Sequence, residues 1–423
     1  MLVIKNGRVI DPKNQIDQVQ DLYIIDGKIV AHDQVDSQIE ITSTLDATGK
    51  VVTPGFIDLS AHVREPGQTQ KGTIASETAA AVASGITMLV TPPTTSPVVD
   101  TAAVAELIID RSEANGLAKI LPTGALTRGL EGQQLAPMHA LHRSGCIAFS
   151  NAREPVPSAL VMLRCLEYAA THDFLVIFKP QDPELTGKGC MHDDTTCTRL
   201  GLAGIPETAE TVELARCLLL VEQTGVRAHF GQLSCDRSVR MIMDARKRGL
   251  NVTADVAVHH LFLTDENVDG FDSQFHVIPP LRSQLDRAGL RHALVTDGIQ
   301  AICSDHQPHD PAAKQAPFAA TEPGISSLET LLPLGLMLVT QQLITLPQLI
   351  DKLTASPAAI LGLNSGSLSH GAAADICIFD PDLEWQLNNE TCTSAGKNTP
   401  FMGSNLIGRV THTLVDGKLV YQL

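Results

Sequence analysis

Eight short apolar segments, each followed by a stretch with helical spacing, constrain the fold of this chain more than any other feature. Two of the helical stretches, Thr73–Ser84 and Glu207–Gln223, are closed by a glycine, which commonly ends a helix. The predicted strands are Phe56–Ile57, Ile86–Val90, Lys119–Thr123, Cys146–Phe149, Phe174–Phe178, Val226–Phe230, Val252–Val256 and Ala301–Ser304. These units predict an α/β fold, a (β/α)8 TIM barrel over residues 53–365 with its functional site at the carboxyl ends of the strands.

Both ends of the chain have the pattern of β-structure. Residues 1–52 contain β-like segments with turns predicted at Asn6-Gly7 and Asp26-Gly27, and residues 366–423 contain similar segments with a turn at Asp416-Gly417. We therefore predict one small β-sandwich domain that is built from both termini and lies beside the barrel. Within the barrel, residues 190–196 are expected to form a polar loop.

Charge and cysteine content narrow the possible partners and the compartment. The net charge of −16 and the lack of a basic tract argue against nucleic acid or an anionic membrane, because phosphate binding needs clustered Lys and Arg. The nine cysteines include no CxxC pair, which favours free thiols and a cytoplasmic location. The first apolar run ends after four residues, and Leu331–Val339 is shorter than the roughly 20 residues of a membrane span, so neither a signal peptide nor an anchor is expected.

Several motifs follow one another at the predicted strand ends. They are Pro54-Gly55-Phe56-Ile57-Asp58, His62-Val63-Arg64-Glu65-Pro66-Gly67, Pro279-Pro280-Leu281-Arg282, Asp305-His306-Gln307-Pro308-His309, Gly324-Ile325-Ser326-Ser327-Leu328-Glu329-Thr330 and Asp416-Gly417-Lys418. In this order the chain resembles, over essentially its full length, the dihydroorotase family of the amidohydrolase superfamily. The resemblance implies reversible ring closure of carbamoyl aspartate by zinc-bound hydroxide, with an aspartate after the last strand moving the proton.

The metal ligands that this resemblance implies are mostly missing. A histidine pair after the first strand, a bridging carboxylate and two further histidines are expected, but their positions hold Ser60, Asn151, Lys179 and Gln232. Only His62 and the catalytic Asp305 remain. Two protein ligands are fewer than the three that catalytic zinc sites usually have, so no bound metal is expected and Asp305 is interpreted as vestigial.

The resemblance also implies a weakened grip on a substrate carboxylate. Arg64 and His309 match residues that hold this group in the family, and a bidentate arginine contact is its strongest part. Two asparagines expected beside them are replaced by Thr94 and Ile278. Arg64 and His309 are therefore interpreted as vestigial substrate-binding residues.

Lys179 leaves two alternatives open. The favoured hypothesis is that Asp305 accepts hydrogen bonds from its neighbours or pairs with the Lys179 ammonium, which would then replace a mobile metal ion with a fixed charge. Lys179 can instead be a carbamylated bridging lysine that has moved to another strand, although the carbamate needs cations nearby. Among the remaining histidines, His229 is a possible displaced ligand, and the pair His259-His260 is expected to have a packing and hydrogen-bonding role.

A last cluster, Cys190, His192, Asp193 and Asp194, has a spacing that matches no tetrahedral metal motif.

Two functional hypotheses remain. The favoured one rests on a resemblance to inactive dihydroorotase-like subunits that associate with the aspartate carbamoyltransferase catalytic subunit and support its assembly. This resemblance implies a cytoplasmic protein without a cofactor. A homodimer is also expected, because two-fold symmetric dimers are common. The other is an active zinc-dependent cyclic amidohydrolase with a mononuclear site of His62, Asp305 and His229.

Overall fold

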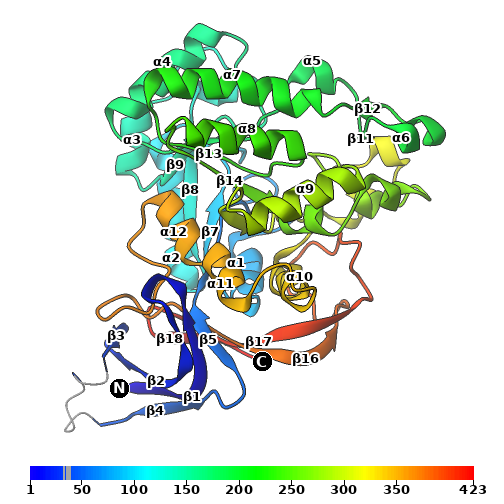
Figure 1. The fold of residues 1–423 in the computed structure, drawn as a ribbon. Helices are drawn as coiled ribbons and strands as arrows, with labels where there is room; N and C mark the ends of the chain where they lie inside the picture. The colour runs from blue at the N-terminus through cyan, green and yellow to red at the C-terminus, as the bar shows by residue number, and fades with distance from the viewer. Residues whose placement is uncertain (32–33, 35–39) are drawn as a thin grey trace.

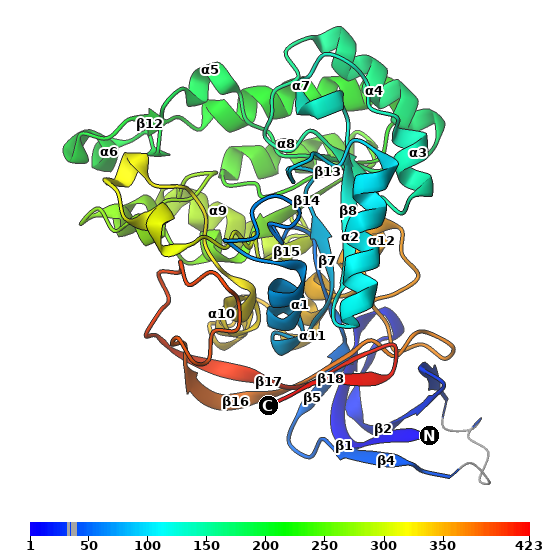
Figure 2. The same cartoon turned by 180° about the vertical axis from the view of Figure 1, so that it is seen from behind.

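The computed structural model describes residues 1–31, 34 and 40–423 and contains two eight-stranded sheets (Figures 1 and 2). The first is a parallel sheet in which each strand pairs with its neighbours in chain order. Its strands are β6 (Phe56–Asp58), β7 (Ile86–Thr91), β8 (Lys119–Ala125), β9 (Ala148–Ser150), β10 (Val176–Phe178), β13 (Ala228–Phe230), β14 (Val252–Ala257) and β15 (Ala301–Cys303).

Backbone hydrogen bonds just past the first and last strands of this sheet close it into a barrel. The His62 N–H donates to the His306 carbonyl at 2.8 Å, and the His306 N–H donates to the Ser60 carbonyl at 3.2 Å. Ala61 and His306 form an isolated parallel bridge between the same two segments. The predicted (β/α)8 barrel is confirmed.

Helices surround the barrel and alternate with its strands. The longer ones are α1 (Ile74–Ala83), α2 (Ala102–Asn115), α3 (Met138–Arg143), α4 (Ala159–Thr171), α7 (Thr208–Thr224), α8 (Asp236–Lys247), α9 (Gln284–Val295), α10 (Leu328–Thr340), α11 (Leu346–Leu353) and α12 (Ala355–Leu361). Helix α1 begins after Thr73, whose hydroxyl accepts from the Ser76 N–H, and α7 ends at Gly225, which has a φ of 68°. These two helices match their predicted ranges closely.

Alternating side chains divide the apolar residues of the barrel between two cores. On β6, Phe56 packs outward into a large cluster with the helices, whereas Ile57 points into a smaller cluster inside the barrel. Met88 and Ile177 belong to the same inner cluster. Because these apolar residues fill part of the interior, polar groups gather beyond the carboxyl ends of the strands.

The second sheet combines strands from both termini, as predicted. Its strands are β1 (Leu2–Asp11), β2 (Ile16–Ile25), β3 (Lys28–Val30), β4 (Ser43–Asp46), β5 (Val51–Pro54), β16 (Ile376–Gln386), β17 (Asn405–Val415) and β18 (Lys418–Gln422). Strand β5 joins the two ends of the chain because it pairs with β1 on one side and β16 on the other. It crosses the predicted domain boundary at residues 52/53. Seven of the strands follow one hydrogen-bonded path, β4 pairs with β1 beside it, and the sheet surrounds a shared apolar cluster.

Two local predictions are wrong. Asn6-Gly7 is not a turn: Asn6 has a φ of 62° and lies at a bulge inside β1, which continues along β2. Residues 190–196 are not a simple polar loop, because β11 (Met191–His192) pairs with β12 (Gly204–Ile205) and α6 (Thr195–Leu200) lies between them. Apolar contacts of Met191 with Val268 and Phe318 bury this segment.

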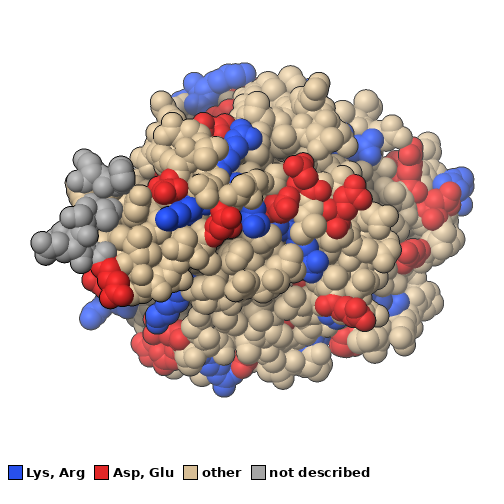
Figure 3. All heavy atoms as spheres, turned by 90° about the horizontal axis from the view of Figure 1, so that it is seen from below, with Lys and Arg blue, Asp and Glu red and all other residues tan. Residues whose placement is uncertain are grey.

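The terminal sheet packs against the barrel helices. Figure 1 shows β16 and β17 directly below α1 and α10, and the Thr413 hydroxyl donates to the Val82 carbonyl at 2.6 Å. On the lower face of the molecule, the described Lys and Arg side chains are interspersed with Asp and Glu (Figure 3). All nine cysteines are buried and free. Among the residues described, no helix is both long and apolar enough to cross a bilayer.

Candidate functional site

Three of the positions that lack a metal ligand meet inside the barrel mouth. Ser60 follows β6, Lys179 follows β10 and Gln232 follows β13, so closure of the barrel brings their side chains together. The Ser60 hydroxyl accepts hydrogen bonds from Lys179 Nζ at 3.0 Å and from Gln232 Nε2 at 2.7 Å. These residues therefore bond to one another.

Gln232 is the centre of this network. Its side-chain amide donates to Ser60 and to Asp305 Oδ1, and its Oε1 accepts from the Arg153 guanidinium at 2.7 Å. The backbone N–H of Gln232 donates to Asp255 Oδ1 at 2.6 Å, and its φ of 58° turns the side chain at the end of β13. The buried amide thus uses both of its donors and its acceptor.

Asp305 is buried and accepts hydrogen bonds from neutral amides. Gln232 donates to Asp305 Oδ1, and Gln307 Nε2 donates to Oδ1 at 3.1 Å and to Oδ2 at 3.2 Å. Burial raises the pKa of Asp305, and the positive charges of Lys179 and Arg153 oppose this shift only in part. The predicted direct pairing of Lys179 with Asp305 is wrong, because the ammonium bonds to Ser60 and the two charges interact across the network.

Arg153 is the residue that the sequence interpretation missed. It lies in the loop after β9, where Nη1 donates to Gln181 at 3.4 Å and Nη2 donates to Gln232. Burial lowers the pKa of Arg153 and of Lys179, while Asp305 acts on both in the opposite direction. An arginine close behind the lost carboxylate position Asn151 was the signal that could have identified it.

These residues do not fit a zinc ion. A lysine ammonium carries no lone pair, the Gln232 oxygen faces a guanidinium, and the Ser60 hydroxyl accepts two hydrogen bonds. Among the residues that the structure describes, no three His, Cys, Asp or Glu side chains are placed to hold a metal. A carbamate on Lys179 would need metal ions beside it, and these residues do not supply the ligands for them.

The two retained histidines do not complete a ligand set. His62 makes no side-chain hydrogen bond to any described residue, and desolvation together with the charges of Arg64 and Lys179 holds its pKa well below the usual range. His229 is directed into a buried pair: its ring nitrogens lie 2.8 Å from Thr253 Oγ1 and 2.8 Å from Asp255 Oδ2. His229 pairs in register with Ile177, which lies inside the barrel, but both of its ring nitrogens are engaged by Thr253 and Asp255.

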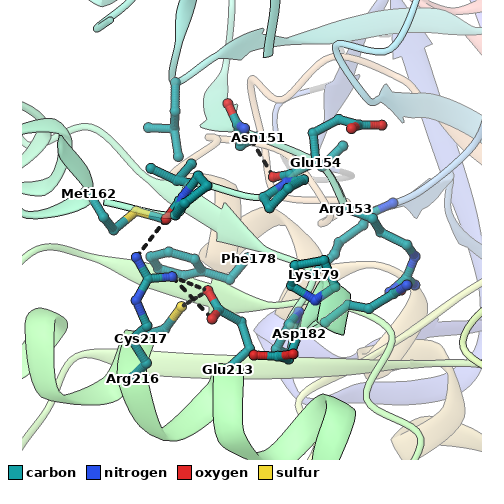
Figure 4. Close-up of a pocket in the computed structure, with 18 of the residues that line it drawn as sticks. Asn151, Arg153, Glu154, Met162, Phe178, Lys179, Asp182, Glu213, Arg216 and Cys217 are labelled. Atoms are coloured by element: carbon teal, nitrogen blue, oxygen red, sulfur yellow. Dashed lines mark hydrogen bonds and ion pairs between the residues drawn. The ribbon is translucent and has the colours of Figure 1, made fainter. Parts of the chain in front are cut away.

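Asn151 has a structural role at some distance from the network. Its Oδ1 accepts from the Thr127 hydroxyl at 2.7 Å, and its Nδ2 donates to the carbonyls of Leu130 and Glu154 at 3.1 and 3.0 Å. Figure 4 shows Asn151 at the edge of a pocket beside Glu154. This amide joins two neighbouring loops, a task that needs the donors an aspartate lacks.

Arg64 and His309 lie together, as the resemblance implies. The Arg64 Nε donates to the Pro308 carbonyl at 3.0 Å, and Nη2 lies 3.2 Å from His309 Nε2. Burial and the Arg64 charge lower the pKa of His309 to about 4, so its ring is neutral at neutral pH. Glu322 lies 3.4 Å from His309 Nδ1 and also contacts Lys71. A carboxylate of the chain itself thus borders this pair.

The expected hydrogen-bonding role of the His259-His260 pair holds for His260 and is wrong for His259. His260 Nε2 lies 3.2 Å from the Pro279 carbonyl, whereas both ring nitrogens of the buried His259 lack a hydrogen-bond partner among the described residues. His192 Nδ1 lies 3.1 Å from Arg282. Asp194 caps α6 by accepting a hydrogen bond from the Cys197 N–H.

Comparison with known proteins places this barrel in a family. A family model described as Dihydro-orotase-like matches residues 49–238, and one described as Amidohydrolase family matches residues 189–420. A dihydroorotase-like protein of Pseudomonas aeruginosa is 52% identical, with 99% of each chain covered. A dihydroorotase of Anaeromyxobacter dehalogenans is 43% identical and covers 100% of this chain and 98% of its own length.

Solved structures agree on the fold. The L-hydantoinase of Arthrobacter aurescens superposes with a TM-score of 0.88 at 22% identity, covering 100% of this chain and 96% of its own. A D-hydantoinase of a Thermus species gives 0.85 at 22% identity, with 100% and 95% covered. The barrel and its terminal β-domain define the amidohydrolase fold. Within that class the full-length relatives show that this chain belongs to the dihydroorotase-like family, as its motifs predicted.

Proposed function

We propose that this chain is a catalytically inactive dihydroorotase-like protein. The observation that carries the proposal is the hydrogen-bonded network in the barrel mouth, in which Ser60, Lys179 and Gln232 occupy metal-ligand positions and bond to each other and to Asp305. Asp305 would act as the proton carrier only beside a metal-bound hydroxide, and here its oxygens accept from amides. The fixed charges of Lys179 and Arg153 take over part of the electrostatic role of the metal.

We further propose that the protein supports assembly of aspartate carbamoyltransferase through that enzyme's catalytic subunit, as a homodimer in the cytoplasm and without a cofactor. The support is the resemblance to inactive subunits of this kind, together with a barrel that is complete outside its ligand positions. A fold that keeps its core while its ligands are replaced is consistent with a role for its surface.

The test combines metal analysis, turnover and assembly. The purified protein, dialysed and then supplied with Zn²⁺, should hold far less than one zinc per chain and form no dihydroorotate from carbamoyl aspartate. Size-exclusion chromatography with the transferase catalytic subunit from the same organism should give a joint peak. Stoichiometric zinc with turnover would refute the inactivity, and separate elution at micromolar concentrations would refute the assembly role.

An active zinc-dependent cyclic amidohydrolase is the second candidate, and one observation favours it: a protein named dihydroorotase is 43% identical along the whole chain. Asp305, Arg64 and His309 would be its retained site residues. The engagement of His229 with Asp255 weighs against it, because it removes the third ligand of the mononuclear site. The turnover assay decides between the two candidates.

A further inference from the structure

A cavity of about 270 Å³ opens between the loops that follow β9 and β10. Figure 4 shows Arg153 and Lys179 on one side of this pocket, with Met162, Cys217 and Arg216 across from them. The volume is at the small end of the range for ligand sites. Lys179 and Arg153 therefore border both the network in the barrel mouth and a space that can hold a small molecule.

Four carboxylates also line this cavity: Glu154 and Glu184 are exposed, whereas Asp182 and Glu213 are half-buried and have partners. Glu213 accepts two hydrogen bonds from Arg216, at 3.0 and 3.1 Å. Asp182 accepts from the Leu185 N–H at 2.9 Å at the start of a short helix, α5 (Pro183–Thr186). Asp255 is bonded to His229. None of these carboxylates contacts Arg153 or Lys179.

Lys179 and Arg153, the two cations of this cavity, retain N–H groups that make no hydrogen bond to a described residue. An ammonium has three N–H groups, and Lys179 uses one of them, toward Ser60. A guanidinium has five, and Arg153 makes two hydrogen bonds, both to neutral amide oxygens. Asp305 is the carboxylate that acts most strongly on both, and it contacts neither directly. Asp255 also acts on both cations and Glu210 acts on Arg153, but no carboxylate among the described residues bonds directly to either cation. An anion that did so would be stabilised by the two charges.

We propose that this cavity binds a small molecule carrying a carboxylate or phosphate group, with Lys179 and Arg153 as its charged partners. The site is separate from the Arg64–His309 pair, which lies after β6 and β15. It does not depend on the proposed role in assembly, because a barrel that fails to bind the transferase would keep the same two cations.

The experiment is isothermal titration calorimetry on the full-length protein at constant ionic strength. The probes are succinate for a carboxylate ligand and inorganic phosphate for a phosphate ligand, and the tighter of the two identifies the chemistry. Arg153→Gln and Lys179→Met should each weaken binding by roughly ten- to a hundredfold, because each removes a charged hydrogen-bond donor. Lys179→Arg keeps the charge and should retain most of the affinity.

Arg64→Gln is the matched control, since it removes a cation of the same mouth outside the cavity. Its affinity should change much less than that of Arg153→Gln or Lys179→Met, because Arg64 does not line the cavity. Circular dichroism checks that each variant is folded, and Lys179→Gln, which also removes the charge, replaces Lys179→Met if the latter is not. No binding of either probe at millimolar concentration would overturn the proposal. So would binding that Arg64→Gln abolishes and Arg153→Gln does not.

Discussion

Replacing Gln232 by leucine is the sharpest test of the network in the barrel mouth. Leucine has a similar size and the same Cβ, so the positive φ of the backbone adds little new strain. The change removes the hydrogen bonds to Ser60, Asp305 and Arg153, two of which have a charged partner. A hydrogen bond with a charged partner contributes about 1.5–3 kcal/mol to the unfolding free energy, and one between two neutral groups contributes about 1 kcal/mol.

The expected net loss is about 3 kcal/mol of unfolding free energy, because Asp305 keeps its contacts with Gln307 and Arg153 keeps its contact with Gln181. For a chain of this length this corresponds to a melting temperature lower by about 3 °C. Urea unfolding followed by circular dichroism measures the change. Gln307→Leu is the control and should cost less than Gln232→Leu, since this partly exposed side chain contacts Asp305 alone in the network. If Gln232→Leu were as stable as wild type, the network would not stabilise the mouth.

Three further predictions concern the same region. Lys179→Met should change the unfolding free energy by less than about 1 kcal/mol, since burial of the ammonium offsets its single hydrogen bond; a loss above about 2 kcal/mol in urea would indicate a direct ion pair. Asp58→Asn should flatten the pH dependence of stability. Burial, opposed by hydrogen bonds from Ser304, raises the pKa of Asp58 to about 6, above the unfolded value near 4. Wild type therefore loses up to about 3 kcal/mol as the pH rises from 4 through 6. Urea titrations at pH 4, 6 and 8 measure this loss, and the same change of unfolding free energy with pH in wild type and variant would refute the assignment. The variant Ser60→His, Lys179→His, Gln232→His should retain about one zinc per chain after dialysis, measured by elemental analysis, because it restores three imidazole ligands; a zinc content no higher than in wild type would show that lost ligands are not the reason for weak binding.

Local patterns explain which parts of the fold were predictable. The barrel strands are short apolar runs, and helices such as α1 and α7 begin and end at residues whose caps lie next to them in the chain. The predictions that failed depend on distant partners. Asn6-Gly7 becomes a bulge because β1 continues along β2, and residues 190–196 fold because Val268 and Phe318 cover Met191.

The same division applies to the site. The order of the motifs was enough to identify the family and to show which ligand positions had changed, because the strands of a barrel are arranged in chain order. The sequence could not show that Gln232 bonds to Ser60, Asp305 and Arg153 at once, or that Lys179 contacts Ser60. Those contacts join loops that are far apart in the chain and meet only when the barrel closes. Residue types set what each side chain can donate or accept, and tertiary structure decided which of them meet.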